Sequence, residues 1–299
     1  MLVIGTRGSQ LALAQARWVK DRLEALGWEC RLEIIRTTGD KITDVPLARI
    51  GGKGLFTKEI EEALLEGRVD LAVHSLKDLP VELPAGLRLT AVPVREDARD
   101  VVAGRPLAEL PPGARVGTSS LRRSAQLRLL RPDLVIEPVR GNLDTRLRKL
   151  DAGQHDALIV AAAGMHRMGW SDRIVEYLAP EQMCPAPGQG ALGIETRAEG
   201  EAFRACSALD DPAARAAVTA ERAFLAALGG GCQVPIGAYA EVRDGRLRLY
   251  AIVVAPDGAR AVRDWREGLP ADAVSLGYEL AQAMLAAGAR EILEAVYGR

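Results

Sequence analysis

The sequence predicts an α/β protein in which two domains are built on mainly parallel sheets, followed by a small α+β domain with a three-stranded antiparallel sheet. Up to about residue 195, short apolar strands alternate with helices whose apolar residues recur every three or four positions. Beyond residue 235, strands joined by Asp-Gly turns replace that alternation. The first pattern favours parallel strands covered on both faces, and the second favours antiparallel hairpins.

The first domain begins with a strand at 2–4, a loop, and a helix that Ser9 caps and Gly27 closes. Similar patterns predict its other elements. These are strands at 31–35, 69–73 and 87–94, a long loop at 37–54 and a helix capped by Thr57. A strand at 191–195, after the linker-like stretch 185–190, is expected to return to this domain.

The second domain repeats the strand–helix pattern with more positive charge. Strands are expected at 114–117, 134–139 and 157–162, each leading into a helix start. Residues 115–149 carry nine basic and three acidic side chains, a local charge of +6 in a chain whose net charge is −1. Because the surplus is local, it does not indicate a general nucleic-acid binder.

A long helix that Asp211-Pro212 begins leads into the third domain. Strands at 238–242, 247–254 and 261–267 form hairpins, and the helical end at 276–296 is expected to pack on them. The expected boundaries are 1–94 with 189–208 for domain 1, 99–184 for domain 2 and 212–299 for domain 3.

The composition is that of a soluble globular protein, with 48% hydrophobic and 26% charged residues. The longest apolar run, 157–165, is too short to cross a bilayer, and the N-terminus resembles a strand rather than a signal peptide. The four cysteines lie far apart, and with the three histidines they show no metal-site spacing. We expect a cytoplasmic protein with free thiols and no metal.

One cysteine has an unusual setting, because Cys232 follows three glycines and precedes Val-Pro-Ile-Gly. Glycines let the backbone take positive φ and let another group approach closely. A helix C-cap that runs into a turn, with Cys232 as a small apolar filler, explains the pattern equally well. A thiol on an accessible loop, to which another group attaches, is the alternative. The segment by itself does not decide between them.

Arginine and hydroxyl side chains recur where strands of the first two domains end. They are Arg7 with Ser9, Thr118 and Ser120 with Arg122 and Arg123, Arg140 with Arg146, and Arg167. Ligands of open α/β sheets bind at the carboxyl ends of strands, and guanidinium groups favour carboxylates or phosphates. One such arginine is usually a solvated surface charge, but the recurrence predicts a ligand with several negative charges. Asp78 is the exception: it suits a cation or N–H donor of that ligand, or it caps a turn.

Seven short motifs resemble, in this order and over nearly the whole chain, those of the porphobilinogen deaminases, also called hydroxymethylbilane synthases. They are Thr6–Ser9 with Leu11-Ala12, Gly51–Phe56, His74–Asp78, Gly117–Arg123, Arg140–Asn142, Gly188–Gly190, and Glu221-Arg222 followed by Gly230–Gly237. Each motif is short, but their joint order is very specific. The resemblance implies two domains like those of periplasmic binding proteins, with the active cleft between them, and a third domain that carries a cysteine on a loop.

The resemblance also implies the chemistry. Enzymes of this family are transferases of tetrapyrrole biosynthesis, which leads to haem and chlorophyll, and they deaminate and condense four porphobilinogen molecules head to tail into hydroxymethylbilane. The product grows on a dipyrromethane cofactor that the enzyme builds from its own substrate and holds by a thioether, here to Cys232. A cytoplasmic monomer is expected, with the small polycarboxylate porphobilinogen as its partner and neither nucleic acid nor membrane.

By the same resemblance, each candidate residue has a role. Asp78 is the catalytic residue, which holds pyrrole N–H groups and stabilises the cationic intermediate. The cofactor ligands are Cys232, Ser75, Lys77, Thr118, Ser120, Arg122, Arg123, Arg140 and Gly141. The substrate ligands are Arg7, Ser9, Arg140, Arg146, Arg167 and Gln189. A mobile loop holds Arg49, Lys53 and Phe56, and Arg49 departs from the family pattern, in which lysine is expected.

Two other functions fit part of the sequence. A solute-binding protein of the same two-domain architecture explains the arginines, but it explains neither Cys232 nor the third domain, and no export signal is visible. A cysteine acyltransferase acting on an anionic acyl donor needs a histidine near Cys232, and no histidine follows His166. The site residues therefore favour the deaminase hypothesis.

Overall fold

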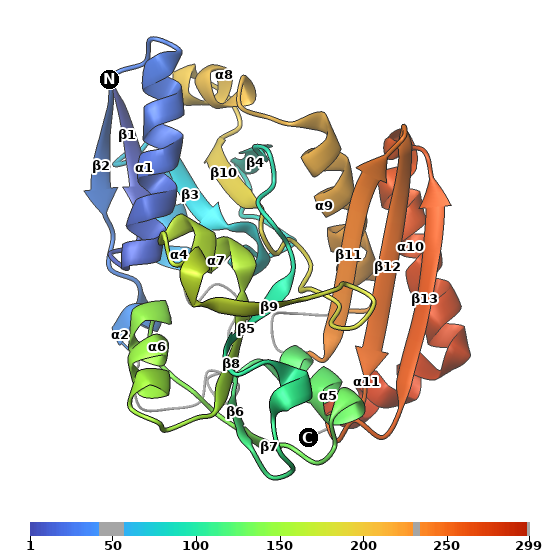
Figure 1. Cartoon of the computed structure of the whole chain (residues 1–299). Helices are drawn as coiled ribbons and strands as arrows, with labels where there is room; N and C mark the ends of the chain where they lie inside the picture. The colour runs from blue at the N-terminus through green and yellow to red at the C-terminus, as the bar shows by residue number, and fades with distance from the viewer. Residues whose placement is uncertain (42–56, 230–233, 298–299) are drawn as a thin grey trace. The chain divides into compact units, whose positions relative to one another are not determined.

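The computed structural model describes residues 1–41, 57–229 and 234–297 (Figure 1). The chain divides into two compact units, of which the first contains residues 1–96 and 191–215 and the second contains residues 97–190 and 216–299. The chain therefore passes from one unit to the other three times. The three-domain boundaries stay a prediction, and most of the expected second and third domains fall in the second unit.

The first unit is built on a five-stranded sheet in the order β2-β1-β3-β10-β4 (Figure 1). Its strands are β1 (Leu2–Thr6), β2 (Cys30–Ile34), β3 (Leu71–Ser75), β4 (Leu87–Ala91) and β10 (Leu192–Arg197). β1 pairs in parallel with β2 and β3, whereas β10 runs antiparallel to β3 and β4. Four strands share one direction, which confirms the mainly parallel sheet. The opposite direction of β10 was not expected.

The described residues of the first unit form four α-helices that lie wholly within it. They are α1 (Gln10–Ala25), α2 (Thr38–Lys41), α4 (Lys58–Leu65) and α8 (Glu201–Ser207). Ser9 caps α1 as predicted, since its hydroxyl accepts the Ala12 N–H at 3.3 Å. One expectation was wrong, because α2 occupies the start of the expected loop. Thr57 is the N-cap residue of α4, as expected, but its side chain makes no capping hydrogen bond. Thr57, at φ −120° and ψ −29°, lacks the extended backbone of a capping residue.

The sheet of the first unit is covered on both faces by apolar side chains. Val19 and Leu23 of α1 belong to one buried cluster with Ile4 of β1. Ile60 of α4 belongs to a second buried cluster with Ala72 of β3. Side chains alternate between the two faces along a strand, so β1 and β3 contribute to both clusters.

The second unit contains another five-stranded sheet, in the order β7-β6-β8-β5-β9. Its strands are β5 (Asp100–Gly104), β6 (Arg115–Gly117), β7 (Val135–Glu137), β8 (Ala157–Ala161) and β9 (Ile174–Leu178). β6 pairs in parallel with β7 and β8, and β5 runs antiparallel to β8 and β9. The topology of the first sheet is thus repeated. β5 and β9 are strands that the sequence patterns did not predict.

The helices that follow β6, β7 and β8 start where the strand ends predict them. They are α5 (Leu121–Leu130), α6 (Leu143–Asp151) and α7 (Ala162–Arg167). Ser120 caps α5, because its hydroxyl accepts the Arg123 N–H at 3.4 Å. Short 3₁₀ turns in the two units are η1 (Leu76–Asp78), η2 (Leu107–Glu109), η3 (Ser171–Arg173) and η4 (Pro270–Asp272).

The rest of the second unit is the predicted α+β part, an antiparallel sheet in the order β11-β12-β13 (Figure 1). Its elements are β11 (Ile236–Arg243), β12 (Arg246–Val254), β13 (Ala261–Gly268), α9 (Pro212–Ala227), α10 (Ala273–Met284), the π-helical turn η5 (Leu285–Ala289) and α11 (Arg290–Tyr297). Leu249 of β12 shares a core with Phe224 of α9 and Leu280 of α10. The helical end therefore packs on this sheet as expected.

Candidate functional site

In the first unit, β1 and β3 lie side by side and run in parallel, so their carboxyl ends meet at one edge of the sheet. The predicted residues that follow or end these strands are Arg7, Ser9, Ser75, Lys77 and Asp78. Gln15 of α1 donates from Nε2 to the Ser75 hydroxyl at 2.8 Å, which ties α1 to the end of β3. Asp78, at the end of η1, is exposed, and the other four residues are half-buried.

The first unit also contains a buried polar cluster, formed by His74, Glu195 and Glu61, and His74 directly precedes Ser75 in the sequence. His74 Nε2 is 3.0 Å from Glu195 Oε2, and these side chains are 4% and 0% exposed. Glu61 of α4 is also buried, and burial raises the pKa of its carboxyl. Oε1 of Glu61 and Oε1 of Glu195 have no hydrogen-bond partner among the described residues. This cluster was not predicted, although the acid at the end of the apolar strand expected at 191–195 was a signal for it.

The second unit gathers its predicted residues in the same way, because β7, β6 and β8 are parallel neighbours. Thr118 and Ser120 follow β6, Arg140, Gly141 and Arg146 follow β7, and Arg167 ends the helix after β8. Gly141 has φ 101°, and a β-carbon there would lie 2.6 Å from the Thr145 side chain, so this turn requires glycine. Arg146 Nε donates to the Gly141 carbonyl at 2.8 Å and holds the turn.

Arg122 and Arg123, both predicted cofactor ligands, are buried against Asp100, the first residue of β5. Arg122 Nη1 donates to Asp100 Oδ2 at 2.6 Å, and Arg123 Nη2 donates to Asp100 Oδ1 at 2.7 Å. Burial by itself would raise the pKa of Asp100, but the two guanidinium groups outweigh it and hold that pKa far below its usual range. Asp100 is therefore ionised and was not among the predicted residues.

Gln189, a predicted substrate ligand, belongs to the same buried network. Its Nε2 donates to the Ala98 carbonyl at 2.7 Å and to Asp100 Oδ1 at 2.8 Å. Its Oε1 accepts from Arg122 and Arg123 at 3.5 and 3.4 Å. Gln189 thus connects residues 98–100, where the chain enters β5, with the segment near residue 190, where the chain leaves this unit.

Several predicted residues lie outside the described parts of the chain. They are Cys232 and the three loop residues Arg49, Lys53 and Phe56. Cys232 falls between α9 and β11. The other cysteines, Cys30, Cys184 and Cys206, are buried, and burial raises the pKa of the Cys184 and Cys206 thiols to about 12. Neither of these two thiols is suited to ionise and act as a nucleophile.

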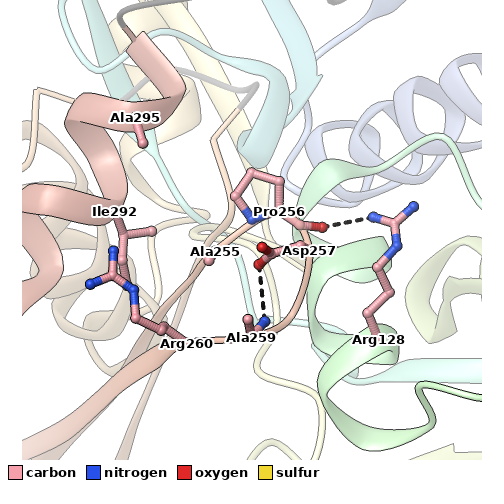
Figure 2. A pocket seen from close by; sticks show the side chains of 8 residues that line it. All are labelled: Arg128, Ala255, Pro256, Asp257, Ala259, Arg260, Ile292 and Ala295. Atoms are coloured by element: carbon pink, nitrogen blue, oxygen red, sulfur yellow. Dashed lines mark hydrogen bonds between the residues drawn. The ribbon is translucent and has the colours of Figure 1, made fainter.

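A pocket of about 530 Å³ lies in the second unit, and none of the residues that line it is a predicted site residue (Figure 2). It is lined by Arg128, Ala255, Pro256, Asp257, Ala259, Arg260, Ile292 and Ala295. Arg128 donates to the Pro256 carbonyl at 2.7 Å, and Asp257 accepts the Ala259 N–H at 3.0 Å (Figure 2). Arg128 and Asp257 are thus both engaged with backbone groups of the β12–β13 turn. The pocket is therefore best described as the place where this turn packs against α5.

The described residues contain no group of three or more His, Cys, Asp or Glu side chains placed to hold a metal ion. In the same residues, no helix has the length and apolar character needed to cross a membrane. His166, for which no role was predicted, has Nε2 2.8 Å from the Tyr177 hydroxyl.

Comparisons with known proteins agree with the motifs. Residues 2–205 match the family described as "Porphobilinogen deaminase, dipyromethane cofactor binding domain", and residues 215–286 match "Porphobilinogen deaminase, C-terminal domain". The porphobilinogen deaminase of Syntrophobacter fumaroxidans is 55% identical over 98% of this chain and 97% of its own length. That of Roseiflexus castenholzii is 54% identical over 98% of each chain. The expected enzyme class is confirmed, and this chain belongs to the porphobilinogen deaminase family.

Proposed function

We propose that this enzyme condenses four porphobilinogen molecules head to tail into hydroxymethylbilane, on a dipyrromethane cofactor joined to Cys232 by a thioether, in tetrapyrrole biosynthesis. The supporting observation is the distribution of charge at the two sheet edges. Cations and hydroxyl groups follow the parallel strands of both units, and one carboxylate, Asp78, follows β3. This pattern matches a ligand with several carboxylates and a ring N–H. A monomeric state and a cytoplasmic location belong to the same proposal.

The residues of the second unit fit the cofactor. Its acetate and propionate groups need cations and N–H donors, and this edge offers Arg140 and the capped start of α5. Thr118, whose hydroxyl accepts the Ser120 N–H at 3.2 Å, shapes the turn that leads into this helix. When bound, the dipyrromethane supplies the pyrrole carbon to which the first substrate is joined.

In each condensation, the C–N bond of the aminomethyl group breaks, ammonia leaves, and a carbon–carbon bond forms to the free α-carbon of the preceding pyrrole. That carbon then loses its proton, and a final water releases the product after four rounds. Arg7 and Ser9 hold substrate carboxylates at the edge of the first sheet. Asp78 accepts a hydrogen bond from the pyrrole N–H and stabilises the positive charge that the substrate ring gains when ammonia leaves.

The proposal predicts that the purified protein is heavier than its sequence by two linked pyrrole units. Cys232→Ser should have the mass of its sequence and no turnover, because oxygen at this position does not form the thioether. Cys30→Ser, which changes a buried thiol of the first unit, should keep the added mass. Intact-mass spectrometry with a turnover assay tests this. A fully active wild type without added mass contradicts the proposal.

A further inference from the structure

A single carboxylate serves both arginines of the buried network. Asp100 is 0% exposed, and the Arg122 and Arg123 side chains are 5% and 8% exposed. Asp100 accepts from Arg122 Nη1 and from Nε and Nη2 of Arg123, at 2.6 to 3.0 Å. Two positive charges and one negative charge leave this group with a net charge of +1.

The hydrogen bonds leave this group incompletely paired. Two guanidinium groups carry ten N–H donors. Seven of them meet acceptors: three on Asp100, two on Gln189 Oε1, and one each on the carbonyls of Cys184 and Ile159. Two donors of Arg122 and one of Arg123 have no acceptor among the described residues. The leftover positive charge and the leftover donors both suit one further carboxylate.

We propose that Asp100 is a positioning residue. It holds the Arg122 and Arg123 guanidinium groups in place and limits their net charge to +1, so that the pair binds one carboxylate group of the ligand rather than two. The inference rests on the proposed function, which makes these arginines ligands of a polycarboxylate. Asp100 neutralises one of the two charges and holds both guanidinium groups in place, and Gln189 braces the arrangement. Without Asp100, the buried pair carries +2 and binds a doubly charged anion more tightly.

The test compares Asp100→Asn with Asp133→Asn, a matched control in which the lost carboxylate belongs to an exposed residue and pairs with the half-buried Arg131 just after α5. The probe is sodium sulfate, added at constant ionic strength to the purified full chain, and the readout is the rise of the unfolding temperature. The apparent affinity for sulfate should rise at least about tenfold in Asp100→Asn and stay unchanged in Asp133→Asn. Intact mass, measured in parallel, should show a smaller cofactor-bearing fraction for Asp100→Asn only.

A double variant separates charge from simple loss of structure. Asp100→Asn/Arg123→Gln restores the net charge of +1, so it should fold even if Asp100→Asn does not, and its sulfate affinity should return toward the wild-type value. Two results would overturn the proposal. One is an Asp100→Asn variant that folds but binds sulfate no more tightly than wild type. The other is that Asp100→Asn fails to fold and the double variant fails as well. Failure of the proposed function appears separately, as a wild type without added mass, and leaves the sulfate comparison valid.

Discussion

Asp78 differs in charge from the arginine and lysine side chains predicted beside it at the strand ends. Those cations meet carboxylates of the ligand whose charge stays constant through the reaction. The pyrrole ring, by contrast, becomes positive when ammonia leaves, and only an interaction that strengthens as this charge appears accelerates the step. Asp78 should therefore matter more for turnover than for holding the ligand.

Asp78→Asn keeps the size of the side chain and one acceptor but removes the charge. We expect its turnover to fall by roughly two or more powers of ten, with pyrrole units still attached to the protein. Asp78→Glu keeps the charge but displaces it by one methylene, so it should retain more activity than the Asn variant. Steady-state rates and intact masses of the two variants decide this. An Asn variant as fast as wild type would remove Asp78 from the mechanism.

Glu61 gives the first unit a predictable dependence on pH. Burial raises the pKa of its carboxyl, Glu195 adds to this effect, and Thr57 and His74 oppose it. An acid whose pKa is raised on folding holds its proton more tightly in the folded protein. The folded protein therefore loses stability as the pH rises above 4.5, the pKa of this carboxyl in the unfolded chain, because the carboxyl ionises more readily there.

Glu61→Gln mimics the protonated acid and should be more stable than wild type, by an amount that grows as the pH rises from 4.5 toward neutrality. Chemical denaturation at several pH values measures the difference. Glu62→Gln is the control, because this neighbouring side chain is 50% exposed, and it should show no such trend. A gain that is equal for both variants, or that shrinks with rising pH, is the contrary result.

At the scale of the elements, α10 approaches α9 so closely at Gly277 that there is no room for a side chain at this position. A β-carbon at Gly277 would collide with the Ala220 carbonyl oxygen and lie 2.8 Å from the Phe224 nitrogen. Both are backbone atoms of α9, which do not move aside as the tip of a side chain does. Gly277 is therefore required by the approach of the two helices.

Gly277→Ala has two opposing effects. Helix propensity favours alanine by about 1 kcal/mol, whereas overpacking against a backbone costs ~1–3 kcal/mol or more. We expect the free energy of unfolding to fall by about 1–2 kcal/mol, as measured in urea. Gln282→Ala, at an exposed position of the same helix, should change it by less than about 0.5 kcal/mol. A stabilised Gly277→Ala would show that α10 shifts freely on α9.

Over the whole molecule, features that depend on nearby residues were predictable from the sequence. Ser9 and Ser120 cap α1 and α5 through backbone N–H groups three residues further on. The hairpins after residue 235 follow from turn residues between apolar strands. The strand ends near Arg7, Asp78 and Arg140 were predictable as well, because a short apolar run in the sequence marks each of these strands.

Tertiary structure alone decided which distant residues share a buried environment. Asp100 lies 22 residues from Arg122, and His74 lies 121 residues from Glu195, yet each pair is in contact and buried. The opposite direction of β10 and β5 is likewise set by strands from distant parts of the chain. A charged residue looks the same in a local pattern whether water or another charge surrounds it. Its pKa and its role depend on what packs around it, and for these residues that is settled by segments far away in the sequence.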